Sequence, residues 1–92
     1  MIEIYGIPET LHNCWGCVQS RKLLDRLGIE YTFYPVLVKS DNDLGFDYDR
    51  VRIEELAKRK RQKGIGFTYP QIFKDGIPIG GFMELKLILG ED

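Results

Sequence analysis

Two cysteines, Cys14 and Cys17, constrain this chain more than any other feature, because they are the only cysteines among 92 residues and only two residues separate them. Ile2 and Ile4 alternate with polar neighbours just before the pair, as in a strand. Leucines recur after the pair with the spacing of one helix face. The pair is therefore predicted at the start of a helix that follows a strand.

The residues leave three interpretations of the pair open: a redox couple, a metal site, or two cysteines packed in the core. A structural zinc site usually takes four Cys or His ligands. The chain offers two cysteines and one histidine, His12, so no metal site is expected. Free cysteines are often buried as small apolar residues. A C-x-x-C pair in a strand–helix context favours the redox couple.

Composition predicts one globular domain over residues 1–92, since 43% of the residues are hydrophobic and 29% are charged. A net charge of −1 gives no indication of nucleic acid or an anionic membrane as a partner. The chain has neither an apolar run of membrane-spanning length nor a secretory start. We therefore expect a cytoplasmic protein, and in that compartment permanent disulfides are rare.

Hydrophobic spacing and turn residues predict the order β-α-β-α-β-β-α. The expected elements are a strand over 2–6, a helix from 14 to Gly28, a strand over 29–38 ending near Pro35, a helix over 50–63 ended by Gly64, a hairpin over 67–79 and a helix over 82–89. Residues 39–49 are expected to form a polar loop, with Asp47 or Asp49 capping the next helix. This order predicts an α/β fold with a four-stranded mixed sheet and helices on both faces.

The chemistry of a C-x-x-C pair at a helix start assigns different roles to its two thiols. Unpaired N–H groups and the helix dipole favour a thiolate at Cys14, which would attack a disulfide. Cys17, one turn further on, would then resolve the mixed disulfide. His12 is predicted to be a surface loop residue, with a role as a base as the alternative. The basic run over 58–63 is predicted to be a solvated helix end, with an anionic partner as the alternative.

Three separated motifs resemble the glutaredoxins, and most closely the small phage-type members. They are Cys14-Trp15-Gly16-Cys17, Thr68-Tyr69-Pro70-Gln71-Ile72-Phe73 and Gly80-Gly81-Phe82. The resemblance implies the thioredoxin fold, a cis bond before Pro70 and a groove beside Cys14. It also implies that glutathione or a substrate peptide binds along the groove residues Trp15, Thr68, Tyr69, Pro70, Gly81, Phe82 and Met83.

The implied function is a dithiol–disulfide oxidoreductase that reduces protein disulfides or glutathione mixed disulfides, with ribonucleotide reductase as an acceptor. The alternatives are a glutathione-dependent iron–sulfur cluster carrier and a redox-insensitive adaptor that retains the motif. The expected reductant is glutathione or a thioredoxin-type reductase, and we expect a monomer without a tightly bound cofactor. Asn13 and Met83 stand where the family commonly has a basic and an acidic residue, and Glu84 is the next acidic candidate. These departures predict weak glutathione affinity.

Overall fold

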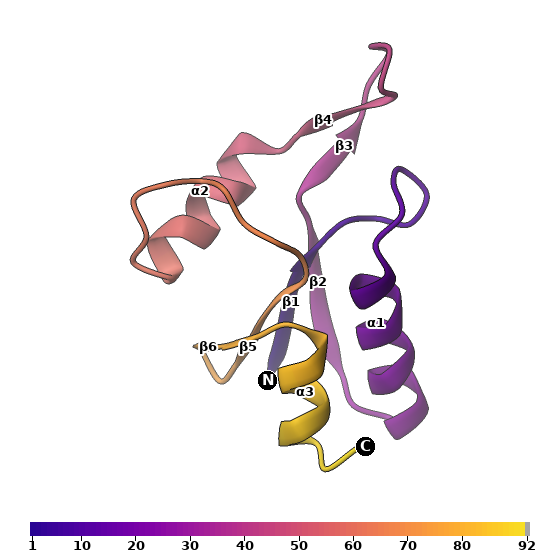
Figure 1. Ribbon diagram of the computed structural model, residues 1–92, viewed down its shortest axis with the longest axis vertical. Helices are drawn as coiled ribbons and strands as arrows, with labels where there is room; N and C mark the ends of the chain where they lie inside the picture. The colour runs from indigo at the N-terminus through magenta and orange to yellow at the C-terminus, as the bar shows by residue number, and fades with distance from the viewer. Residues whose placement is uncertain (92) are drawn as a thin grey trace.

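The fold is built on a four-stranded mixed sheet, seen in a computed structural model that describes residues 1–91 (Figure 1). The strand order is β2-β1-β5-β6. Strands β1 (Ile2–Gly6) and β2 (Tyr31–Pro35) are parallel, whereas β5 (Gln71–Lys74) and β6 (Ile77–Gly80) form an antiparallel hairpin with β5 against β1. The predicted mixed sheet is confirmed, and β6 with Pro78 lies at its edge, where a missing N–H is tolerated.

Helices cover both faces of the sheet, as predicted, because successive side chains of a strand point to opposite faces. Ile2 and Ile4 of β1 pack with α1 (Trp15–Leu27) and α3 (Phe82–Ile88) in one core. Tyr5 points the other way and packs with α2 (Arg50–Arg59) in a second core. Figure 1 shows α1 and α3 together, apart from α2. Every helix therefore has a buried face against the sheet.

The prediction of a loop over 39–49 is wrong. Strands β3 (Leu37–Lys39) and β4 (Phe46–Tyr48) form a separate antiparallel hairpin that extends away from the main sheet (Figure 1). Asn42 holds its turn, because the side-chain oxygen accepts the Gly45 N–H at 2.9 Å and the side-chain amide donates to the Phe46 carbonyl at 2.9 Å. The order of elements thus gains two short strands before α2.

Two predicted boundaries also need correction. The strand expected from residue 29 begins only at Tyr31, whereas its end at Pro35 is as predicted, and the Val36 N–H donates to the Gly6 carbonyl before the chain leaves the main sheet. Helix α2 ends at Arg59 rather than near Gly64, because Arg61 takes a left-handed conformation with φ of 55°. The predicted Gly28 stop and Asp49 cap are confirmed.

Within residues 1–91, no helix combines the length and the apolar character that crossing a membrane requires.

Candidate active site

Cys14 and Cys17 form a disulfide at the N-terminus of α1, with their Cα atoms 5.3 Å apart. Cys14 is the N-cap residue, in extended conformation, and its Sγ accepts the Cys17 N–H at 3.3 Å. Cys14 is half-buried, whereas Cys17 is only 1% exposed. The outer sulfur of the pair is therefore Cys14.

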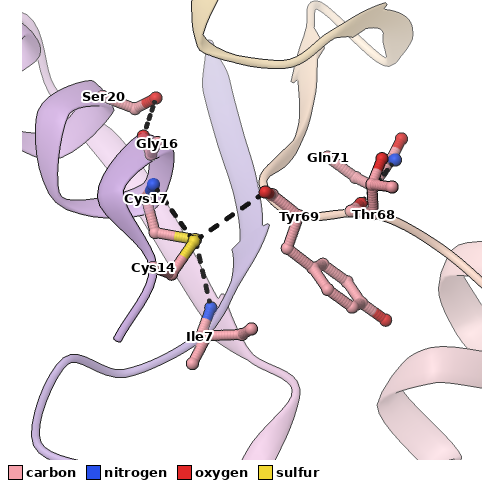
Figure 2. The surroundings of a disulfide bond; sticks show 8 residues. All are labelled: Ile7, Cys14, Gly16, Cys17, Ser20, Thr68, Tyr69 and Gln71. Atoms are coloured by element: carbon pink, nitrogen blue, oxygen red, sulfur yellow. Dashed lines mark hydrogen bonds between the residues drawn. A yellow bond between two sulfur atoms is a disulfide. The ribbon is translucent and has the colours of Figure 1, made fainter. Parts of the chain in front are cut away.

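Backbone groups from two other segments contact the sulfurs (Figure 2). The Tyr69 carbonyl oxygen lies 3.8 Å from Cys14 Sγ, and the Ile7 N–H donates to Cys17 Sγ at 3.4 Å. The Tyr69–Pro70 peptide bond is cis, as the resemblance implied. Pro70 lies so close to α1 that a Cβ added at Gly16 would be 2.9 Å from Pro70 Cδ. The first turn of α1 is thus packed directly on the cis-proline loop.

The charges at this helix end favour a thiolate. The first turn of α1 contains no acidic residue, and its free N–H groups and positive dipole end face the Cys14 side. A hydrogen bond from the Cys17 N–H to Cys14 Sγ favours the charged form further. Once the disulfide is reduced, Cys14 is the sulfur with both access and electrostatic support for nucleophilic attack.

A groove of about 360 Å³ lies beside the pair, between α1, the cis-proline loop and the start of α3. Every residue predicted to bind glutathione or substrate lines it: Trp15, Thr68, Tyr69, Pro70, Gly81, Phe82 and Met83. Trp15 is 65% exposed, and its ring packs edge-on against Phe82 with centroids 5.3 Å apart. The structure therefore brings three motifs that are remote in sequence to one groove.

Three further polar side chains line the groove: Glu84, the acidic candidate next to Met83, and Lys60 and Gln71, which were not predicted as site residues. Lys60 Nζ donates to Gln71 Oε1 at 2.7 Å, and Gln71 Nε2 donates to the Thr68 carbonyl at 2.7 Å. Glu84 accepts the Gly81 N–H at 2.7 Å. Lys60 belongs to the basic run that was predicted to be a solvated helix end, so that prediction fails for this residue.

The position of Lys60 is fixed by its neighbour, Arg59. The Arg59 guanidinium contacts both carboxylate oxygens of Glu3, at 2.8 and 3.0 Å, and lies 4.0 Å from the centroid of the Phe73 ring. Arg59 holds the pKa of Glu3 below its ordinary value. Burial raises the pKa of Tyr5, which is in the same network, to about 12. These contacts anchor the last turn of α2 on the sheet, and Lys60 follows directly.

His12, the alternative base of the sequence analysis, is exposed, and its ring lies 5.7 Å from that of Phe46 in β4. Across residues 1–91, no three His, Cys, Asp or Glu side chains gather in an arrangement that could hold a metal ion.

The chain is similar in sequence to two proteins of enterobacteria phage T4. It is 32% identical to a glutaredoxin over 87 residues, covering 94% of this chain and 95% of the relative. It is 43% identical over 94 residues to an uncharacterized 11.8 kDa protein in the Gp55-nrdG intergenic region, covering 99% of this chain and 89% of that protein. No protein-family model matches the sequence.

Solved glutaredoxin structures share the fold. Glutaredoxin 1 from Francisella tularensis, complexed with cacodylate, superposes with a TM-score of 0.61 at 24% identity, over 98% of this chain and 96% of its own. A buckwheat glutaredoxin–glutathione complex superposes with a TM-score of 0.60 at 22% identity, over 98% of this chain and 70% of the buckwheat chain.

The cysteine pair, the cis-proline loop and the near-complete match to the phage T4 relative together place this chain in the glutaredoxin family. The protein is thus a thiol–disulfide oxidoreductase with a thioredoxin-like fold.

Proposed function

We propose that this protein reduces protein disulfides and glutathione mixed disulfides, with Cys14 as the nucleophile and Cys17 as the resolving thiol. The observation that supports this most directly is the position of Cys14 Sγ. It is the outer sulfur, it accepts a helix N-terminal N–H, and it lies beside the groove. The Cys17 sulfur is buried, so it is not accessible for the first attack on a bulky substrate disulfide.

The reaction proceeds in two exchanges. The Cys14 thiolate attacks one sulfur of the substrate disulfide, a new S–S bond forms, and the other substrate sulfur leaves as a thiolate and takes a proton from solvent. Cys17 then loses its proton and attacks Cys14 Sγ, which releases the second substrate thiol. The substrate gains two electrons and two protons, and the Cys14–Cys17 disulfide forms. Two thiols of the reductant restore the dithiol.

Glutathione fits the groove as reductant. A peptide cysteine can pair with the Tyr69 backbone in the manner of an added strand, which would bring its sulfur to Cys14. Lys60 offers a cation for a carboxylate at one end, and Gly81, Phe82 and Met83 provide backbone contacts at the other. The buckwheat relative was solved as a glutathione complex. The resemblance to the phage-type members makes a ribonucleotide reductase disulfide the protein substrate that we propose.

The test is a matched pair of lysine variants. Lys60→Met removes the cation in the groove, whereas Lys58→Met removes an exposed cation two residues earlier, in the last turn of α2. We expect Lys60→Met to raise the KM for glutathione about tenfold, and Lys58→Met to leave it unchanged, because a charge-assisted contact is lost only at the groove.

Turnover should be measured with glutathione plus glutathione reductase, and separately with thioredoxin reductase, on one disulfide substrate. Equal KM values for the two variants would refute the assignment of the glutathione site. No turnover with glutathione, combined with full turnover with thioredoxin reductase, would assign the reductant role to the flavoprotein instead.

A further inference from the structure

A second cavity, of about 470 Å³, lies on the other side of Tyr69 from the groove. Its walls come from the β3–β4 hairpin, the start of α2, the loop over 65–67 and the segment before Cys14. Apart from His12, Arg50 and Gly66, all of its lining residues have aliphatic or aromatic side chains. Its volume is that of a small-molecule site, so it can take a large side chain together with part of its backbone.

Two residues that line the cavity also contact the sulfurs of the redox pair through their backbones. Ile7 lines it, and the Ile7 N–H donates to Cys17 Sγ. Tyr69 lines it too, and the Tyr69 carbonyl lies 3.8 Å from Cys14 Sγ. Figure 2 shows the Tyr69 ring pointing away from the sulfur that its backbone oxygen faces. Among residues 1–91, Tyr69 alone lines both the groove and this cavity.

We propose that this cavity is a specificity pocket for protein substrates, an inference that rests on the function proposed above. The pocket would bind a large apolar side chain of the substrate, near the substrate cysteine that Cys14 attacks. A segment joined to Cys14 through a mixed disulfide has a high effective concentration at the cavity, so an apolar contact there contributes without a separate binding step. Glutathione, held in the groove beyond Tyr69, leaves the cavity free. The cavity therefore distinguishes protein disulfides from glutathione disulfides.

The charge at the cavity favours an acidic group beside that apolar side chain. Arg50 is a lining residue, and among residues 1–91 it forms no ion pair. An acidic residue of the substrate would pair with it. The occupant is thus an extended segment that carries an aromatic residue and a carboxylate close to its cysteine.

The test uses single-turnover reduction by the fully reduced protein, so that one disulfide forms in the protein for each one broken in the substrate. The substrates are a set of acidic peptides with an intramolecular disulfide and one tryptophan at successive flanking positions, and the same peptides with serine there. Oxidised glutathione is the third substrate. The variant is Tyr48→Ser combined with Ile65→Ser, because these lining side chains are 60% and 38% exposed and support little of the core. Val51→Ser is the control, since Val51 is 79% exposed and does not line the cavity.

We expect the wild type and Val51→Ser to reduce at least one tryptophan peptide about tenfold faster than its serine counterpart, which is the discrimination that one apolar pocket provides. In the double variant this preference should fall to about twofold or less, because the apolar walls are lost. All three proteins should reduce oxidised glutathione at the same rate. The proposal would be overturned if the wild type showed no preference for tryptophan peptides, or if the double variant kept the full preference. It would also be overturned if the double variant reduced oxidised glutathione more slowly by the same factor as the tryptophan peptide.

A binding measurement separates this inference from the proposed function. Each tryptophan peptide, with serines in place of its cysteines, is titrated into the wild type, and amide chemical shifts are followed by NMR. Shifts at Phe46 and Phe67 that are absent in the double variant support the pocket, and unchanged spectra with every peptide refute it. If the wild type reduces none of the substrates, the proposed function fails, and this titration alone decides whether the pocket exists.

Discussion

Gly16→Ala probes how tightly the redox helix is packed against the cis-proline loop. The added Cβ would lie 2.9 Å from Pro70 Cδ, whereas ordinary van der Waals contact begins at 3.4 Å. The first turn of α1 must therefore move by roughly the 0.5 Å between these distances, because Pro70 is buried and its ring is rigid.

Two opposing effects set the size of the change in stability. Overpacking at a tight contact costs about 1–3 kcal/mol. Alanine gains about 1 kcal/mol or less over glycine in a helix. With about 2 kcal/mol for the overpacking, the middle of its range, the net result is a loss of about 1 kcal/mol, or a fall in Tm of about 4–8 °C for a domain of this size. Because the displaced turn carries Cys14 away from Tyr69, kcat/KM should fall about tenfold.

The assay combines thermal unfolding with turnover of a glutathione mixed disulfide. Gly64→Ala is the matched control, since a Cβ at Gly64 meets nothing within 4 Å and no left-handed φ is present there. We expect this control to keep both its Tm and its activity. A Gly16→Ala protein with a Tm at or above that of the wild type, and with full turnover, would refute the close packing of α1 on Pro70.

Two further predictions concern the network that anchors α2. The pKa of Glu3 is lowered by the Arg59 guanidinium, so ionised Glu3 stabilises the fold above its ordinary pKa of 4.5, and this contribution is lost as the pH falls through the lowered value. In urea unfolding, Glu3→Gln should therefore lose less stability than the wild type between about pH 5 and about pH 3. Parallel curves of the free energy of unfolding against pH for the two proteins would contradict this. Burial raises the pKa of Tyr5 from 10.0 to about 12, so the wild type should lose stability as the pH rises from 10.0 to about 12. Tyr5→Phe should reduce that alkaline loss, part of which remains because the pKa values of Tyr34 and Tyr69 are also raised, and an unchanged alkaline slope would contradict the role of Tyr5.

The sequence predicted the elements whose signals are local. The α1 start at the cysteine pair, the Gly28 stop and the Asp49 cap each depend on a few adjacent residues, and all three are as predicted. The three motifs of the groove also come together as the resemblance implied.

The sequence did not predict features that depend on short strands or on tertiary contacts. Strands β3 and β4 have three residues each, too few for a period-2 pattern to stand out, and Asn42 closes their turn with side-chain hydrogen bonds. Helix α2 ends early because Arg61, not a glycine, takes the left-handed conformation.

Lys60 illustrates the same limit within the site. Its neighbours in the run over 58–63 are also basic, so nothing local distinguished it as a groove residue. Its place depends on the contact of Arg59 with Glu3, which is 56 residues away in the sequence, and on the hydrogen bond of Lys60 to Gln71. The cavity beyond Tyr69 could not be predicted either, because one of its walls is the β3–β4 hairpin, which the sequence did not predict.

The assignment of Cys14 as the nucleophile and Cys17 as the resolving thiol is tested most directly by trapping the mixed disulfide with glutathione. Each single variant, Cys14→Ser and Cys17→Ser, is incubated with oxidised glutathione and analysed by intact mass under non-reducing conditions. We expect Cys17→Ser to gain one glutathione at Cys14 rapidly and completely, since no resolving thiol remains, and Cys14→Ser to react far more slowly because Cys17 is only 1% exposed. Rapid modification of Cys14→Ser at Cys17, with Cys17→Ser left unmodified, would contradict the assignment of Cys14 as the nucleophile.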